Sequence, residues 1–282
     1  MLSNFFKTKP VIDESSKEWI FDTFAWCIEQ LDGEFFKNNS ELILPNNKFY
    51  PGSSTSVEEM AETIFSNTLK YSGMTSWPIK LTAAETFTQK PMPQLIFESR
   101  LRGEKVNVTT NANSALDTAI SYKVEGDKLA PSTPSIDIAF HSSQLNQPQD
   151  LIAYLVQIQA GILVNQNGVL PPGGKEVLPQ TIDLVACFMG FGIIFSNTAY
   201  QFKGGCGSCN NQNLNRQSAL PELETVYGLA LFCVIKGIEI QQVKKELKSH
   251  LYKPFRQAHK EIILYLQQTT NPEHKLLTTG IK

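Results

Sequence analysis

The sequence is poor in charged residues, and neither sign dominates. Only 18% of its 282 residues are charged, and 25 Lys and Arg against 27 Asp and Glu leave a net charge of −2. Globular proteins carry about 25% charged residues. Without a basic excess, the chain offers neither the broad basic face that nucleic acid requires nor a polybasic membrane anchor. The composition therefore predicts no nucleic-acid partner and no membrane association.

Long apolar runs are also lacking. The longest extends from Leu184 to Phe195, which is short of the roughly 20 residues that cross a bilayer. The segment from Met1 to Lys7 lacks the apolar core of a secretory signal. Five cysteines, an odd number in a long chain, do not indicate a secreted disulfide framework. We expect a cytoplasmic protein whose apolar residues, 41% of the total, bury a sizeable core.

Periodicity predicts an α+β fold that is rich in helix, especially in its C-terminal half. Helical patterns occupy residues 15–32, 56–71, 149–164, 181–195, 220–236, 243–248 and 254–268. Strand-like patterns occupy residues 41–44, 94–98 and 135–141. We expect a small mixed sheet within a single domain spanning 1–282. This domain can be subdivided into an N-terminal helical part, 1–90, and a part with the core and the C-terminal helices, 91–282.

Local signals mark where two of these helices begin and end. Gly33 stands where a glycine in the left-handed conformation would end the first helix. Ser56 and Glu59 have the spacing of a capping box, in which the Ser56 hydroxyl accepts from the backbone of Glu59. The strand at 135–141 alternates apolar and polar residues, which predicts one buried face.

That strand and the following helix have the arrangement of zincin metallopeptidases. In these enzymes an edge strand binds extended peptide beside a helix that carries HExxH. The two histidines share one helix face and bind Zn²⁺, and the glutamate polarises the metal-bound water. The run from Leu151 to Gly161, LIAYLVQIQAG, resembles the active helix of an uncharacterised bacterial zincin-like family, which typically reads LIA-x-LAHELAH.

Further motifs extend this resemblance from about residue 17 to residue 266. The run 181–193, TIDLVACFMGFGI, resembles the second helix of the family, LTD-LL-x-VF-x-GFGIF. Leu44-Pro45 with Phe49-Tyr50-Pro51 matches LP…FFP, and the run 227–232, YGLALF, matches YALALF. The resemblance implies that the aspartate of the second helix is the third zinc ligand.

In this chain the resemblance implies a degenerate zinc site. Gln157 stands at the first histidine, Ile158 at the glutamate and Gly161 at the second histidine, and only Asp183 keeps its type. Glutamine is a poor ligand for Zn²⁺, glycine has no side chain, and isoleucine cannot transfer a proton. We therefore expect no catalytic residue and no zinc here. Gln157 is the candidate donor to Asp183, and Gly161 is expected to permit close packing of a buried helix.

The leading hypothesis is a zincin-like pseudoenzyme that binds or regulates a protein or peptide partner in the bacterial cytoplasm. Its groove lies beside the edge strand, with Ala139 and His141 as lining candidates. The alternatives are an active metal-dependent hydrolase that holds zinc elsewhere, and a structural subunit of a larger assembly.

Cys206 and Cys209 form a CxxC motif in a loop rich in glycine and asparagine. Two thiolates could serve a zinc site, but the sequence has no second CxxC or CxxH to complete it. A redox CxxC usually opens a helix after a strand, which is not the pattern here. A plain loop, a metal site and a redox pair remain open. The basic segment 243–260, interleaved with Glu246 and Glu261, is expected to be a solvated helix face.

Overall fold

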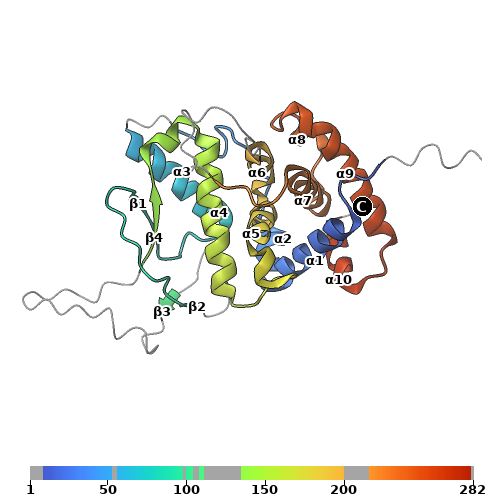
Figure 1. The fold of residues 1–282 in the computed structure, drawn as a ribbon, viewed down its shortest axis with the longest axis horizontal. Coiled ribbons are helices and arrows are strands. Elements are labelled where there is room, and N and C mark those ends of the chain that lie inside the picture. Colours follow the sequence, from blue (N-terminus) through green and yellow to red (C-terminus); the bar gives the residue numbers. More distant parts are fainter. Residues whose placement is uncertain are drawn as a thin grey trace, which may run out of the picture.

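The computed structural model describes residues 9–52, 56–97, 100–103, 108–110, 135–199 and 216–280 (Figure 1). The fold is α+β and dominated by helices, as predicted. The principal helices are α1 (Glu14–Gln30), α2 (Gly33–Asn39), α3 (Val57–Ser72), α4 (Pro148–Asn167), α5 (Leu178–Ala186), α6 (Gly192–Thr198), α7 (Glu222–Ile235), α8 (Ile240–Lys244), α9 (Ser249–Gln268) and α10 (Pro272–Lys275). The strands are β1 (Ile79–Ala83), β2 (Leu95–Phe97), β3 (Val108–Thr110) and β4 (Ile136–Phe140).

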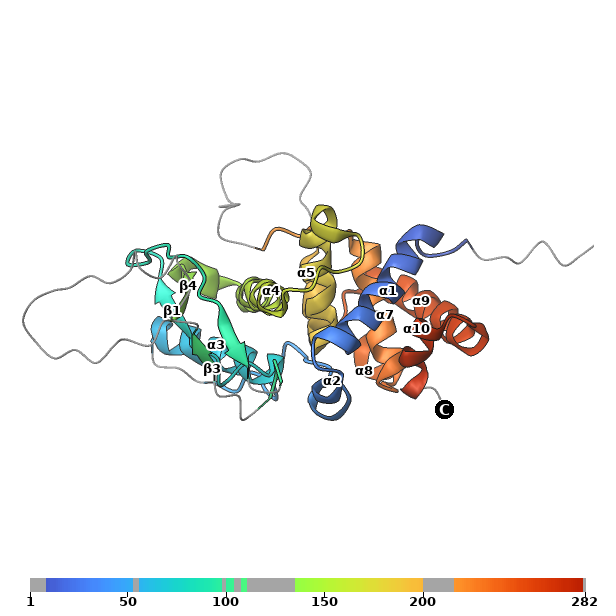
Figure 2. The ribbon, with the colours of Figure 1, turned by 90° about the horizontal axis from the view of Figure 1, so that it is seen from below.

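The helices form successive layers across the molecule. Helix α4 packs between α3 and the pair α5 and α6, and α7 packs between α6 and α9 (Figures 1 and 2). Helix α7 is apolar on all sides because it lies inside these layers, and every residue from Thr225 to Ile235 is buried. One hydrophobic cluster extends from Ile12 to Leu277.

The strands form two separate sheets where the sequence suggested a single mixed one. Strands β1 and β4 pair in parallel, with Ile79 opposite Ile136, and β2 and β3 pair antiparallel. The second sheet is attached to α4 through Gln166. Its Nε2 donates to the carbonyl of Pro93 at 2.9 Å, and its Oε1 accepts from the N–H of Leu95 at 2.8 Å.

The apolar helix expected at 181–195 is broken at Gly190. Its φ of 104° ends a π-helical stretch, Cys187–Phe191, between α5 and α6. A Cβ at this position would lie 2.1 Å from the carbonyl oxygen of Glu41, so only glycine lets the neighbouring segment pass. The predicted strand 41–44 is that segment. It is not a strand, because Ile43 donates its N–H to the carbonyl of Gly190 at 3.0 Å and pairs with no described strand.

The two predicted helix signals have different outcomes. Ser56 caps α3 and accepts the N–H of Glu59 at 3.1 Å, as expected. Gly33 begins α2 instead of ending α1, and the left-handed residue between these helices is Asp32, with a φ of 72°. Aspartate tolerates this conformation better than most residues. Its carboxylate also accepts the N–H of Arg102 at 2.8 Å, which holds the turn.

The segment Gly174–Thr198 is long and apolar enough to cross a membrane, and it alone passes that test among the described residues. Of its most apolar window, 72% is buried inside the protein. This burial is what the core helix of a soluble protein shows, because the apolar side chains already have protein partners.

Candidate functional site

The candidate site is centred on Asp183, a fully buried carboxylate on α5. Its Oδ1 accepts from Nε2 of Gln157 on α4 at 2.7 Å. Its Oδ2 accepts the backbone N–H groups of Ala219 at 2.8 Å and Leu220 at 3.0 Å. The expected contact between Gln157 and Asp183 is therefore present, and two donors from the segment that precedes α7 add to it.

Arg216 supplies the positive charge beside this carboxylate. Its Nη1 lies 3.0 Å from Oδ2 of Asp183, and both side chains are at most 1% exposed. The contact is an ion pair only, since Nη1 makes no hydrogen bond with a described residue. Nη2 donates to the carbonyl of Phe195 at 3.0 Å, and the guanidinium carbon lies 4.2 Å from the centre of the Phe195 ring. A buried carboxylate needs such a partner, because an unpaired buried charge is strongly destabilising.

A pocket of about 480 Å³ opens next to Asp183. The three degenerate positions, Gln157, Ile158 and Gly161, all line it. The other lining residues are Leu178, Pro179, Ile182, Gln217, Ser218 and Ala219. None of the lining residues carries an ionisable side chain. The pocket therefore has the surface of a binding site for an apolar group, and its lining residues offer no acid or base.

Gly161 does not serve the close packing that its type suggested. A Cβ built on it would meet only Cδ1 of Ile182, at an ordinary distance of 3.5 Å. Gly161 and Gln157 are both half-buried and border the pocket, so the expectation of a plain buried helix is wrong for this face of α4.

Strand β4 has one paired edge, which faces β1. Ile136 donates to the carbonyl of Pro78 at 2.7 Å, and the carbonyl of Phe140 accepts from Ala84 at 2.8 Å. In a parallel ladder, residues two apart direct their backbone groups to the same side, so those of Asp137 and Ala139 point to the other edge. No described strand pairs there. The apolar side chains of β4 are buried as the alternation predicted.

The structure places the two groove candidates, Ala139 and His141, outside the pocket lining. The carbonyl of Ala139 accepts from the hydroxyl of Tyr154 at 2.9 Å, which links the free edge of β4 to α4. His141 caps a short 3₁₀ helix, Ser142–Asn146, with Nδ1 2.7 Å from the Ser143 hydroxyl. The imidazole of His141 therefore holds a turn. Most of the loop 102–134, which was a candidate to cover β4, lies outside the described residues.

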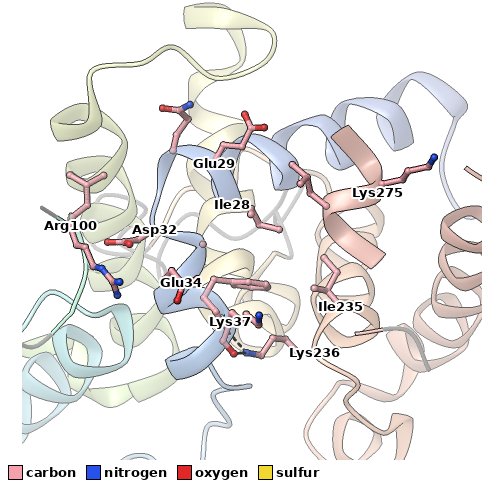
Figure 3. A pocket seen from close by; sticks show the side chains of 14 residues that line it. Ile28, Glu29, Asp32, Glu34, Lys37, Arg100, Ile235, Lys236 and Lys275 are labelled. Carbon is pink, nitrogen blue, oxygen red and sulfur yellow. Dashed lines mark hydrogen bonds between the residues drawn. The ribbon is translucent and has the colours of Figure 1, made fainter. Parts of the chain in front are cut away.

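A second pocket, of about 800 Å³, lies between the end of α1, α2 and the end of α7 (Figure 3). Side chains of both signs line it, including Glu29, Glu34 and Arg100. Lys236 closes the C-terminal end of α2, because its Nζ donates to the carbonyls of Phe36 at 2.7 Å and Lys37 at 2.9 Å. Burial lowers the pKa of Lys236 from its usual value. The pocket carries charges of both signs, and the Lys236 ammonium is already bound to backbone carbonyls. It therefore selects no single class of ligand.

The cysteines divide into two groups. Cys27, Cys187 and Cys233 are buried free thiols, and burial raises the pKa of each, so the thiolate is suppressed. Cys206 and Cys209 lie outside the described residues. Within the parts of the chain that the structure describes, no three His, Cys, Asp or Glu side chains are placed to hold a metal.

Sequence reasoning missed both Arg216 and the larger pocket. Arg216 carries no motif, and the signal that could have found it is electrostatic: an aspartate in an apolar helix requires a cation or several donors nearby. The larger pocket is built from separate segments that no spacing connects.

Comparison of the chain with known protein families, with curated proteins and with solved structures finds no match.

Proposed function

We propose that this protein is a zincin-like pseudoenzyme that binds an extended segment of a protein partner in the cytoplasm. The observation that carries the proposal is the coordination of Asp183. Its four partners are the Gln157 amide, two backbone N–H groups and the Arg216 guanidinium. A guanidinium has no open coordination position and cannot activate a bound water as zinc does.

The partner is expected to use both the free edge of β4 and the pocket of about 480 Å³. Tyr154, Ile158 and Gly161 follow one another at helical spacing, so they share a face of α4. Tyr154 contacts the edge of β4 at one end of this face, and Ile158 and Gly161 border the pocket at the other. An extended chain that pairs with Asp137 and Ala139 can thus place an apolar side chain in the pocket.

Selection of a phage-displayed library of random dodecapeptides on the purified protein tests this proposal. We expect enriched peptides with an aliphatic residue, and their affinity can be measured by fluorescence anisotropy. Ala139→Pro removes a donor at the free edge and should weaken binding at least fivefold, since a hydrogen bond contributes about 1 kcal/mol. Ala139→Gly keeps this donor and is the matched control. Circular dichroism establishes that both variants fold.

Two results would contradict the proposal. One is equal binding of the same peptides by wild type and folded Ala139→Pro, which removes the edge from the interaction. The other is stoichiometric zinc, together with peptide hydrolysis, in protein purified without chelator. That result favours the alternative of a hydrolase with its metal elsewhere, for which Cys206 and Cys209 stay the predicted ligands.

A further inference from the structure

The outer surface of α8, of α9 and of the turn between them carries basic side chains without a close ion pair to a described residue, although one of them, Lys248, interacts electrostatically with Asp150. We call these residues the basic face, and all of them are exposed. They are Lys244, Lys245, Lys248, Lys253, Arg256 and Lys260. None of them forms an ion pair with a residue that the structure describes.

The two glutamates of this segment do not neutralise the basic face. Glu261 lies 3.5 Å from Nζ of Lys17 on α1 and accepts from Gln257 at 2.9 Å. Glu246 accepts from Nδ2 of Asn46 at 3.4 Å and forms no ion pair with a described residue. The interleaving of charges along the sequence is therefore not a pairing of charges in space.

Helical geometry arranges part of the basic face in a line. One side of α9 is buried, namely Leu251, Phe255, Ala258, Ile262 and Leu266. Lys253, Arg256 and Lys260 stand on the opposite side at steps of three and four residues, so they form a row about 10 Å long at 1.5 Å per residue. Leu264 continues the row and is 57% exposed.

Tyr252 helps to hold the face in place. Its ring lies 5.5 Å from Nζ of Lys244 on α8 and 5.9 Å from the guanidinium carbon of Arg256 on α9. Two cations on one ring are oriented without being neutralised. The ring thus orients one cation from each helix, Lys244 from α8 and Arg256 from α9.

We propose that the basic face binds an acidic segment of a partner protein, with carboxylates on the lysine and arginine row and an apolar side chain beside Leu264. The rest of the chain is acidic on balance, so nucleic acid that extends beyond the face meets repulsion. The apolar side of α9 is buried against the core, so the helix has nothing but Leu264 to insert into a bilayer. A short acidic segment of a protein extends little beyond the face and needs no apolar surface that could enter a bilayer. The basic face lies at the far end of the molecule from β4, so this interaction does not depend on the proposed peptide groove (Figure 1).

The test uses fluorescent poly-L-glutamate of fifteen residues and fluorescence anisotropy at low salt. The test variant is Lys253→Gln with Arg256→Gln and Lys260→Gln. The control is Lys70→Gln with Lys80→Gln and Lys175→Gln, which removes the same charge from exposed lysines elsewhere. We expect the test variant to lose at least tenfold in affinity and the control less than twofold. Added salt should weaken the wild-type complex because the charges are exposed.

Three outcomes would overturn the proposal. Equal losses in both variants mean that net charge, and not the basic face, attracts the probe. No wild-type binding at low salt removes the interaction itself. Tighter binding to single-stranded DNA of fifteen nucleotides, or to vesicles that contain phosphatidylserine, assigns the face to nucleic acid or to a membrane. None of these outcomes bears on whether dodecapeptides bind at β4.

Discussion

Replacement of Arg216 by methionine tests whether the guanidinium is what permits Asp183 to be buried. Methionine keeps an unbranched apolar side chain at this position, although a shorter one, and removes both the charge and the hydrogen bond to the Phe195 carbonyl. Loss of one partner from a buried ion pair costs about 3–5 kcal/mol. Asp183 keeps its hydrogen bonds from Gln157, Ala219 and Leu220, so the cost is expected near 3 kcal/mol. That is a large part of the usual 5–15 kcal/mol of a folded domain.

The double variant Arg216→Met with Asp183→Asn separates the charge from the rest of the side chain. An asparagine oxygen still accepts the two backbone N–H groups. Gln157 can turn its amide to accept from the new Nδ2, which gives up its hydrogen bond to the carbonyl of Gln217. We expect the free energy of unfolding of the double variant to lie within about 1 kcal/mol of the wild-type value, because no unpaired charge is then buried. Urea unfolding at neutral pH gives the free energy of unfolding of both variants, provided that the m-value is unchanged.

The reasoning fails if Arg216→Met alone costs less than about 1 kcal/mol, or if the double variant is as unstable as the single one. The first result means that Asp183 does not need the cation. The second means that Arg216 stabilises through its contacts with Phe195 and not through the carboxylate.

Three further predictions address the helices and the pocket. Gly161→Ala should raise the free energy of unfolding by roughly 0.5–1 kcal/mol, because a helix-interior glycine is costly and its Cβ has room. Gly228→Ala should instead lower it by about 1–3 kcal/mol, since a Cβ there lies 2.6 Å from Cδ1 of Leu184; urea unfolding of both variants gives the comparison, and the same sign for both contradicts it. The triple variant Gln157→His, Ile158→Glu and Gly161→His is expected to bind zinc, as measured by calorimetry, only when Arg216→Ser is added. The reason is that Arg216 otherwise forms an ion pair with Asp183, the remaining ligand. A fourfold variant that folds but binds no zinc contradicts the zincin alignment. At the start of α1, hydrogen bonds from the Ser15 hydroxyl and from the backbone and hydroxyl of Ser16 lower the pKa of Asp13 to about 2. Its stabilisation is therefore complete above the ordinary pKa of 3.8 and is lost as the pH falls towards 2, so the acid-induced fall in melting temperature should be smaller in Asp13→Asn than in wild type.

Periodic and capping signals made the helices and β4 predictable. The turn of α3 at Ser56 and the buried face of β4 depend on neighbours within a few residues, which the sequence displays directly. The contact between Gln157 and Asp183 was expected from the resemblance of both helices to a zincin-like family, and that resemblance stays a prediction. The other inferences needed only local chemistry.

The features that escaped prediction depend on segments that meet only in the folded chain. Residue 190 must be a glycine because the backbone of Glu41 passes close to it, and no pattern in the sequence links the two positions. Likewise, β2 is attached to α4 by Gln166, a side chain that reads as an ordinary polar position of a helix. Helical patterns favour a continuous helix at 181–195, and the tertiary contact with residues 41–43 overrides that preference.

In the proposed zincin-like scaffold an arginine takes the place of the metal, which changes what the surrounding residues are free to do. Zinc would impose charged or imidazole ligands on α4 and an open position for water. Arg216 pairs with Asp183 from the side of α6, and positions 157, 158 and 161 border an apolar pocket. Under the proposed function, Asp183 is required for stability and the pocket beside it for binding. Substitutions should separate the two roles. Ile158→Asn, at a half-buried pocket position that also packs against the core, should weaken peptide binding and lower the free energy of unfolding by less than Arg216→Met does. The folded fraction of Arg216→Met should bind peptide as wild type does. A variant pair that shifts both properties together would mean that the pocket has no role of its own.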